Sequence, residues 1–386
     1  MEQQVATSAH ALPPTEVSAG RRGSRLSGLV QYAGFIPALI LYGLFFIVPF
    51  GLIVGYSFWQ TIDYEVVHNW TIDNYRYFFS VPTYVRTMWA TLWVSFAATA
   101  ITLLMAFPLA YWLVRYVRKS LQGFFLVPFG LIVGYSFWQT IDYEVVHNWT
   151  IDNYRYFFSV PTYVRTMWAT LWVSFAATAI TLLMAFPLAY WLVRYVRKGL
   201  QGFFLVLIVV PFWTSYLLRV YSWLNILGEG GAINRFLQWT GLTDAPVSFF
   251  LYDRPAVILV LVYLYFPFAA LTLYASLEKF DWNQYKAALD LGAPPRTALT
   301  RIVLPQMKAG MVTAVIFVFI PILGEYLTPQ LVGGARGVMI GNLIVNFFSG
   351  AQYTRGAAAA LLIAALIVLL LVIFRKSLEV EDPYRA

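Results

Sequence analysis

The chain has 386 residues, of which 60% are apolar and only 11% are charged, and its net charge is +8. Soluble domains usually contain about 25% charged residues, so this composition predicts a protein that lies in a lipid bilayer. The chain has no cysteine, which excludes disulfides, thiolate metal sites and cysteine nucleophiles. The histidines, His10, His68 and His147, do not stand at metal-ligand spacing, and we predict neither a metal site nor a cofactor.

The first segment, residues 1–32, is rich in Ala, Ser, Pro and Gly and ends in a basic cluster of Arg21, Arg22 and Arg25. This composition predicts a disordered cytosolic tail. A cleaved signal peptide is not expected, because the apolar run that follows is about twice as long as the usual signal core of roughly 7–15 residues.

Apolar runs long enough to cross a bilayer, which needs about 20 residues, follow the tail. We predict eight spans, the third of which is the weakest. Their approximate bounds are 33–58, 88–114, 123–139, 167–193, 202–226, 255–276, 310–328 and 357–374. The sequence therefore predicts an all-α, polytopic transmembrane bundle over residues 33–376, followed by a cytosolic tail, 377–386.

The distribution of Lys and Arg predicts the orientation, because cytosolic segments carry the excess of these residues. With a cytosolic N-terminus, seventeen of them fall on the inner side and eight on the outer side. Both termini are then cytosolic. This distribution also accounts for the basic net charge without any nucleic-acid partner.

Residues 48–126 recur as residues 127–205, and only one of the 79 pairs differs, Ser120 against Gly199. Functional repeats in transporters are weakly similar and often inverted, whereas this repeat is direct. Two identical helix pairs do not easily fit two different packing sites. We interpret it as a recent duplication or a sequence-assembly error on a six-span core; the alternative is a true eight-span protein.

A polar segment, residues 277–309, interrupts the apolar runs on the predicted cytosolic side. Asp281 and Gln284 resemble a capping box, Gly292 stands at a C-terminal cap position, and Pro294 and Pro295 suit the start of a second helix. The pattern predicts two short helices joined by a sharp bend, which we call the elbow. Its apolar stripe includes Trp282, Tyr285 and Leu289, and it is expected to pack on the protein's own span ends, on lipid or on a partner.

The stretch "KAALDLGAPPRTALTRIVLP" resembles the signature loop of the inner-membrane permeases of binding-protein-dependent ABC importers. The residues in register with that signature are Ala287, Ala288, Gly292, Ile302, Leu304 and Pro305. Lys286 stands where the family has glutamate, which reverses a charge at one expected polar contact. The resemblance extends through residues 202–376 and one copy of the repeat, and "PILGEYLTPQLVGG" is similar to the spermidine/putrescine branch.

This resemblance implies a bacterial inner-membrane permease with a six-helix core that pairs with a second permease. It also implies two cytosolic ATPase subunits, each receiving one such loop in a groove, and an external binding protein that delivers the solute. Trp282 and Tyr285 are the expected anchors in that groove, with Gly292 and Pro305 fixing the angle. The chain has no phosphate-binding Gly-x-x-x-x-Gly-Lys-Ser/Thr motif, so ATP hydrolysis is assigned to the partners.

Two ionisable residues, Arg219 and Glu325, fall in or beside predicted spans, where charge is costly and often marks a pathway or a pair. Glu325 with Tyr326, and Trp213 with Tyr216, are candidates for a polyamine path, since ammonium groups bind carboxylates and aromatic faces. The alternatives are a structural Arg219–Glu325 ion pair, or two residues at the wet outer edge.

Three function classes follow from these patterns. The first is a non-catalytic transport subunit, for a polyamine or another small solute. The second is a secondary transporter or channel that works alone, without an ATPase. The third, a membrane enzyme, has no catalytic constellation in the sequence to support it, and we predict no catalytic residue.

Overall fold

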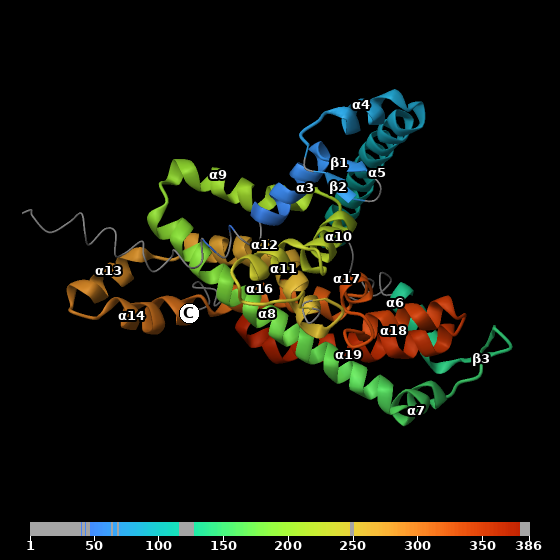
Figure 1. Ribbon diagram of the computed structural model, residues 1–386. Helices are drawn as coiled ribbons and strands as arrows, with labels where there is room; N and C mark the ends of the chain where they lie inside the picture. The colour runs from blue at the N-terminus through green and yellow to red at the C-terminus, as the bar shows by residue number, and fades with distance from the viewer. Residues whose placement is uncertain are drawn as a thin grey trace, which may run out of the picture.

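The computed structural model describes residues 47–62, 65–67, 69–115, 127–247 and 251–378, together with Ile40 and Gly43. These residues form mostly helices, as the sequence predicts, and Figure 1 shows their arrangement. The predicted tail 1–32 and most of the tail 377–386 lie outside the described residues.

The two copies of the repeat form the same series of elements. The first copy consists of α3 (Val48–Phe58), β1 (Gln60–Ile62), β2 (Glu65–Val67), α4 (Asp73–Ser80) and α5 (Pro82–Arg115). The second consists of α6 (Val127–Phe137), β3 (Gln139–Ile141), β4 (Glu144–Val146), α7 (Asp152–Ser159) and α8 (Pro161–Tyr195).

The rest of the chain builds the remaining helices. These are α9 (Lys198–Val209), η3 (Val210–Trp213), α10 (Tyr216–Leu227), α11 (Ala232–Trp239), α12 (Arg254–Glu278), α13 (Trp282–Asp290), α14 (Pro295–Ala298), η5 (Leu299–Val303), α15 (Leu304–Gln306), α16 (Lys308–Leu323), α17 (Leu327–Val332), α18 (Ile340–Ser349) and α19 (Tyr353–Leu378).

Each copy contains a two-stranded antiparallel hairpin that the all-α prediction did not include. In the second copy Gln139 pairs with Val146 and Ile141 with Glu144. The two turn residues between the strands, Asp142 and Tyr143, have φ of 50° and 67°. Positive φ at both central residues is the geometry of the two-residue hairpin turn that matches strand twist.

The core forms where α8 packs along α12, with α16 and α19 beside them. Val257, Val260 and Leu261 of α12 are fully buried there. The approach of α16 to α12 requires Gly310, because a side chain at this position would collide with Ser276. Because lipid is as apolar as these side chains, close packing, with small residues such as Gly310 at the helix contacts, holds the bundle together.

The two copies of the repeat differ in the helices that they contact. The helices α6 and α7 pack on α19, and α8 packs on α12 and α16, whereas α3 touches α10 and the apolar stretch of α5 buries no residue. In Figure 1 the blue and teal helices α4 and α5 project away from the bundle that contains α8. The second copy is therefore the one that forms part of the core.

The predicted spans are confirmed in part. Four helices are long and apolar enough to cross a membrane, at Pro82–Pro108, Pro161–Tyr195, Arg254–Glu278 and Tyr353–Phe374. Two more qualify only as bent pairs: Lys198–Trp213 with Tyr216–Trp239 bends by 87°, and Pro295–Gln306 with Lys308–Leu323 bends by 68°. The described residues thus contain up to six spans instead of eight.

The two spans that differ from the prediction are the first and the third. Most of the segment 33–58 lies outside the described residues, and its described part is the 11-residue helix α3. The segment 123–139 contributes the 11-residue helix α6, which is about half the length that a bilayer requires. Residues 123–126 lie outside the described residues, and a full span at 123–139 is not found among those that the structure describes.

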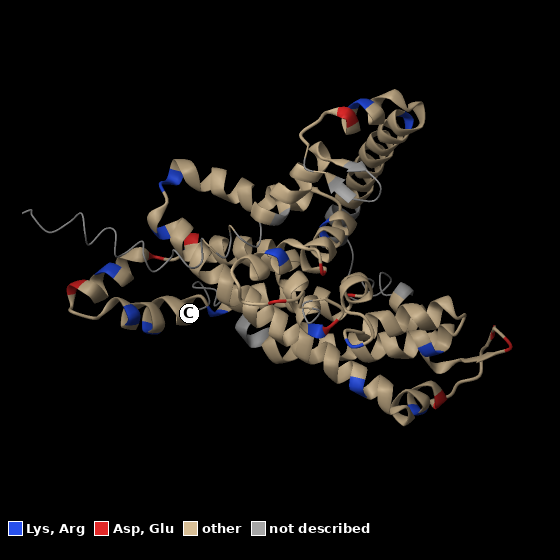
Figure 2. Ribbon diagram, viewed as in Figure 1, with Lys and Arg blue, Asp and Glu red and all other residues tan. Residues whose placement is uncertain are grey.

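Many charged residues lie at the two ends of the bundle, and a few lie between them (Figure 2). Figure 2 shows Lys and Arg gathered on the elbow and at the start of α9 at one end, and mixed charges on α7 and the β3–β4 hairpin at the other. An apolar band between two polar ends is the arrangement that a bilayer selects.

Removing the first copy, residues 48–126, tests how little it contributes to the core. The deletion joins Ile47 to Val127 and so preserves the sequence around the junction. Because the apolar stretch of α5 buries nothing in this chain, we expect the shortened protein to insert and fold. Its melting temperature in detergent should change by no more than about 4 °C, which corresponds to about 1 kcal/mol for a large domain.

The matched control is deletion of residues 127–205, which yields the same chain apart from Ser120 in place of Gly199. The two deletions should therefore behave alike. Loss of folded protein from the membrane in both would show that the extra copy is part of the stable structure.

Candidate functional site

The elbow folds as two short helices, as its sequence predicts. The side chain of Asp281 accepts a hydrogen bond from the backbone N–H of Asn283 over 3.0 Å and so caps α13. Gln284 does not complete a capping box among the bonds of the described residues; it instead accepts a bond from Gln306 over 2.6 Å, which ties α13 to α15. Gly292 has φ of +87°, a conformation that glycine adopts without the cost of a Cβ.

The second half of the elbow is continuous with the span that follows it. Pro295 begins α14, and the chain passes through η5 and α15 into α16. Pro305, within α15, is exposed, whereas Ile302 and Leu304 are half-buried. The segment α14–α15 and the helix α16 thus form one bent unit with an angle of 68° between its two parts.

The aromatic stripe of the elbow packs on the protein's own helix α8. Tyr285 is only 6% exposed, and the ring of Trp282 lies 5.8 Å from it and 5.7 Å from the ring of Tyr190. The guanidinium of Arg194 lies over both rings, 5.4 Å from Trp282 and 5.5 Å from Tyr285. A cation over aromatic faces adds about 0.5–2 kcal/mol of attraction.

In the chain by itself Trp282 and Tyr285 pack on α8, and their role as anchors in a partner's groove stays a prediction. The stripe covers the end of α8, with Tyr285 buried and Trp282 half-buried, so it packs on the protein's own span end, one of the three surfaces that the sequence left open. The outward surface carries Lys286 and Ala287, both exposed, with Ala288 half-buried. At its tip stands Leu291, which is 89% exposed.

A second cluster forms where two helices are interrupted. The first interruption separates η3 from α10, and the second separates α16 from α17. The Tyr216 hydroxyl, on α10, lies 2.7 Å from the Thr328 hydroxyl on α17. The structure thus brings the two breaks together across the bundle.

Glu325 is held within this cluster by hydrogen bonds. One carboxylate oxygen accepts from the backbone N–H groups of Tyr326, Leu327 and Thr328 at 3.1, 3.0 and 3.3 Å. The other accepts from the Tyr265 hydroxyl at 3.2 Å. Glu325 therefore caps the N-terminus of α17, where a negative charge is favourable.

Arg219 lies in the same region but does not pair with Glu325. No ion pair between them occurs among the residues that the structure describes, so the predicted alternative of a structural Arg219–Glu325 pair is wrong there. The Arg219 guanidinium instead lies 4.6 Å above the ring of Phe212 and 5.6 Å from that of Tyr216. Because the side chain is buried, these rings replace part of its hydration.

The remaining predicted path residues lie apart from this contact. Trp213 is 78% exposed and Tyr326 is 43% exposed, so both rings face outward from the described bundle. Sequence reasoning missed Phe212, Tyr265 and Thr328, which complete the cluster. The sequence signal for this cluster was proline, which ends or bends helices. Pro211 lies in η3, just before the first interruption, and Pro321 lies near the end of α16, just before the second.

Comparison with known proteins adds the family. No protein-family model matches the chain. It is 35% identical over 237 residues to the spermidine/putrescine transport system permease protein PotB of Salmonella typhimurium, covering 61% of this chain and 82% of that protein. The Escherichia coli K12 protein of the same name is 34% identical over 61% of this chain and 85% of its own length. The chain belongs to the PotB family of transport-system permeases.

A further relative and a solved structure agree with this family. The inner membrane ABC transporter permease protein YdcU of Escherichia coli K12 is 31% identical, over 58% of this chain and 76% of its own length. The fold resembles a chain of a bacterial alginate ABC transporter with a TM-score of 0.54 and 19% identity, covering 75% of this chain and 98% of that one. The protein is thus a membrane-spanning permease with the ABC-transporter permease fold.

Substitution of Tyr285 by alanine tests the anchoring of the elbow on α8. The buried ring is lost, and removal of a buried aromatic side chain costs about 3–5 kcal/mol. We expect trypsin to cleave the elbow, at Arg296 or Arg301, at least tenfold faster, since cleavage follows the population of the opened state.

Leu291→Ala is the matched control, because that side chain is exposed and surface substitutions usually change stability by less than about 0.5 kcal/mol. Equal cleavage rates in the two variants would contradict the anchoring role of Tyr285.

Proposed function

We propose that the chain is the non-catalytic permease subunit of an ATP-driven importer of polyamines at the bacterial inner membrane. In this proposal it works with a second permease, two cytosolic ATPase subunits and an external binding protein, and both termini are cytosolic. The relatives named as spermidine/putrescine permeases, at 35% identity over 82% of their length, are the observation that carries the substrate class.

The elbow supports coupling to a partner through its shape. Its aromatic side is fixed to α8 by Trp282 and Tyr285, and its far end is the exposed leucine, Leu291. An exposed apolar side chain at the tip of a rigid helix pair is a suitable knob for a hydrophobic groove. In the proposed complex Leu291 enters the ATPase, while the family-signature residues Gly292, Leu304 and Pro305 keep the angle between tip and span.

The cluster at the two helix breaks supports a cation as cargo. It brings a carboxylate, Glu325, together with the hydroxyls of Tyr216 and Tyr265. Ammonium groups interact favourably with carboxylates and with aromatic faces. We propose that Glu325 attracts the polyamine at the helix breaks, with Tyr326 and Trp213 on the exposed side of the path, while Arg219 remains attached to Phe212.

Uptake in vesicles tests the function. The complete transporter, reconstituted with its partner subunits and binding protein, should accumulate labelled spermidine only when ATP is present. The variant Leu291→Asp should lower this uptake at least tenfold and weaken co-purification of the ATPase, because a charge replaces the apolar knob. Leu242→Asp, the same change at another exposed leucine in a predicted outer segment, should leave co-purification unchanged.

Full uptake by the chain alone, without ATP or ATPase, would contradict the proposal and favour a secondary transporter. ATP-driven uptake of a different solute, with no response to spermidine, would retain the importer and overturn the polyamine assignment.

The substitution Glu325→Gln separates the charge of this residue from its capping role. The glutamine oxygen still accepts the backbone hydrogen bonds, so the folded protein should be retained, whereas the negative charge is lost. We expect spermidine uptake to fall by about tenfold, mainly through a higher KM. Glu325→Ala removes the cap as well, at a cost of about 0.5–2 kcal/mol, and equal uptake by the wild-type and Glu325→Gln proteins would exclude a role of the charge.

A further inference from the structure

One face of α5, in the first copy of the repeat, is exposed, whereas the equivalent face of α8 packs on α12 and α16. Val173 of α8 is 1% exposed, whereas its equivalent in α5, Val94, is 67% exposed. On the opposite face the two helices do not differ: Leu183 is 74% exposed and its equivalent Leu104 is 73% exposed. The α5 face that lacks a partner therefore carries the same residues as the α8 face that is buried.

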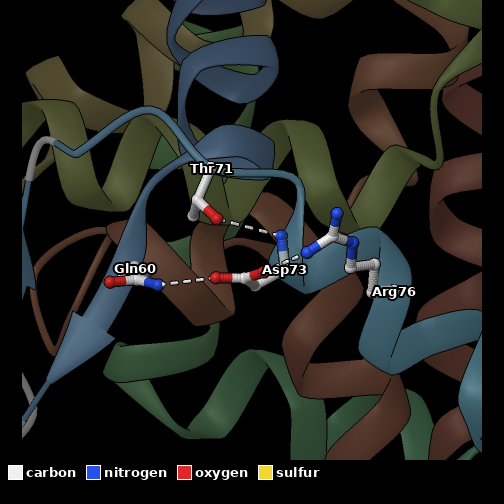
Figure 3. Close-up of polar contacts among 4 residues, drawn as sticks. All are labelled: Gln60, Thr71, Asp73 and Arg76. Atoms are coloured by element: carbon white, nitrogen blue, oxygen red, sulfur yellow. Dashed lines mark hydrogen bonds and ion pairs between the residues drawn. The ribbon is translucent and has the colours of Figure 1, made fainter.

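The two copies also have the same internal shape. In the first copy the Gln60 amide donates to Asp73 over 3.1 Å, the Asp73 N–H donates to Thr71 over 3.1 Å, and Arg76 lies 3.5 Å from Asp73 (Figure 3). The corresponding distances in the second copy are 3.4, 3.1 and 3.6 Å. Each copy thus has the same local contacts, whether or not it is packed.

A second set of internal bonds agrees. The Asn74 amide donates to the carbonyls of Ser57 and Trp59 at 3.1 and 2.7 Å. In the second copy, Asn153 makes the equivalent bonds at 2.9 and 2.7 Å. The unpacked copy is therefore already in the conformation that the packed copy has, and little rearrangement is needed before it packs.

The surface that receives the second copy is well defined. We call it the docking groove; it is formed by α12, α16, α18 and α19. Thr170 accepts a bond from the Ile340 N–H over 2.8 Å, and the Thr354 hydroxyl lies 2.9 Å from that of Thr140. Thr91 and Thr61 occupy the equivalent positions of the first copy.

We propose that residues 48–115 are a second competent occupant of the docking groove and replace residues 127–194 there when the latter are displaced. The identical sequence gives identical side chains for the groove.

The connections to α9 determine which copy occupies the groove in the unmodified chain. Only Val196 and Arg197 separate α8 from α9, whereas α5 would be joined to α9 through the whole second copy. Loop-closure probability falls with about the 3/2 power of loop length, so a connection about 40 times longer is disfavoured by roughly two orders of magnitude. This difference in loop-closure probability agrees with the second copy being the one in the groove. It is small enough for one substitution that disrupts the packing of α8 to reverse the preference.

Disulfide trapping tests the exchange, because the chain has no native cysteine. Thr140→Cys with Thr354→Cys reports the second copy in the groove, since the two hydroxyls lie 2.9 Å apart, within disulfide reach. Thr61→Cys with Thr354→Cys reports the first copy. The disulfides are quantified by mass spectrometry of unreduced peptides from oxidised membranes that contain the full chain.

The displacing substitution is Ala177→Trp on α8, at a residue that is fully buried. We expect it to abolish the 140–354 disulfide and to raise the 61–354 disulfide at least tenfold, with the chain still present in the membrane. The matched control is Ala98→Trp at the equivalent, exposed position of α5, which should leave the 140–354 disulfide unchanged. The double variant should lose both.

Three results would overturn the proposal. The first is loss of the Ala177→Trp chain from the membrane while Ala98→Trp persists, because the first copy then does not replace the second. The second is retention of the 140–354 disulfide in Ala177→Trp. The third is any full-yield disulfide in the double variant, which would show that packing at this alanine does not control docking.

Discussion

The packing of α8 along α12 is the contact on which the other features of the molecule depend. It buries the centre of α12, and the C-terminal end of α8 supplies Tyr190 and Arg194 to the elbow. At the same end the amide of Gln201 donates to the carbonyl of Leu192 over 3.0 Å, and its oxygen accepts from the Tyr274 hydroxyl over 3.0 Å. One helix pair thus fixes the core, the start of α9 and the orientation of the elbow.

The interrupted helices have a different role from this continuous pair. The breaks at Thr214–Ser215 and at Gly324 expose backbone groups inside the bundle, where unsatisfied groups are costly. Glu325 accepts from three of the N–H groups that follow Gly324, and Tyr265 of the continuous helix α12 donates to its carboxylate. The rigid pair therefore supports a polar cluster built from two discontinuous helices, a combination suited to a path for a polar solute.

Much of this architecture could be predicted from the sequence, because its local signals are strong. The Asp281 cap, the left-handed Gly292 and the bend at Pro294–Pro295 are all short-range features, and the structure confirms them. The side that Trp282 and Tyr285 cover could not be predicted, since an amphipathic pattern shows that a face is buried but not against which surface.

Two further features were beyond sequence reasoning for different reasons. The identical copies have identical patterns, so only the length of the connection to α9 distinguishes the one that packs. The role of Glu325 as a cap was missed because a charge within an apolar run suggests a pair or a pathway, while its bonds to three successive N–H groups depend on the local chain reversal after Gly324. The hairpins β1–β2 and β3–β4 were missed because each strand has only three residues.

The exposed face of α5 has a consequence for how this chain changes over generations. A substitution on the buried face of α8 alters the core at once, whereas the same substitution on α5 meets only solvent or lipid and is nearly neutral. Selection therefore acts unequally on two segments that are alike in sequence. Apolar replacements are free to accumulate in the first segment by drift, and the second is held close to its present form by the helices that surround it.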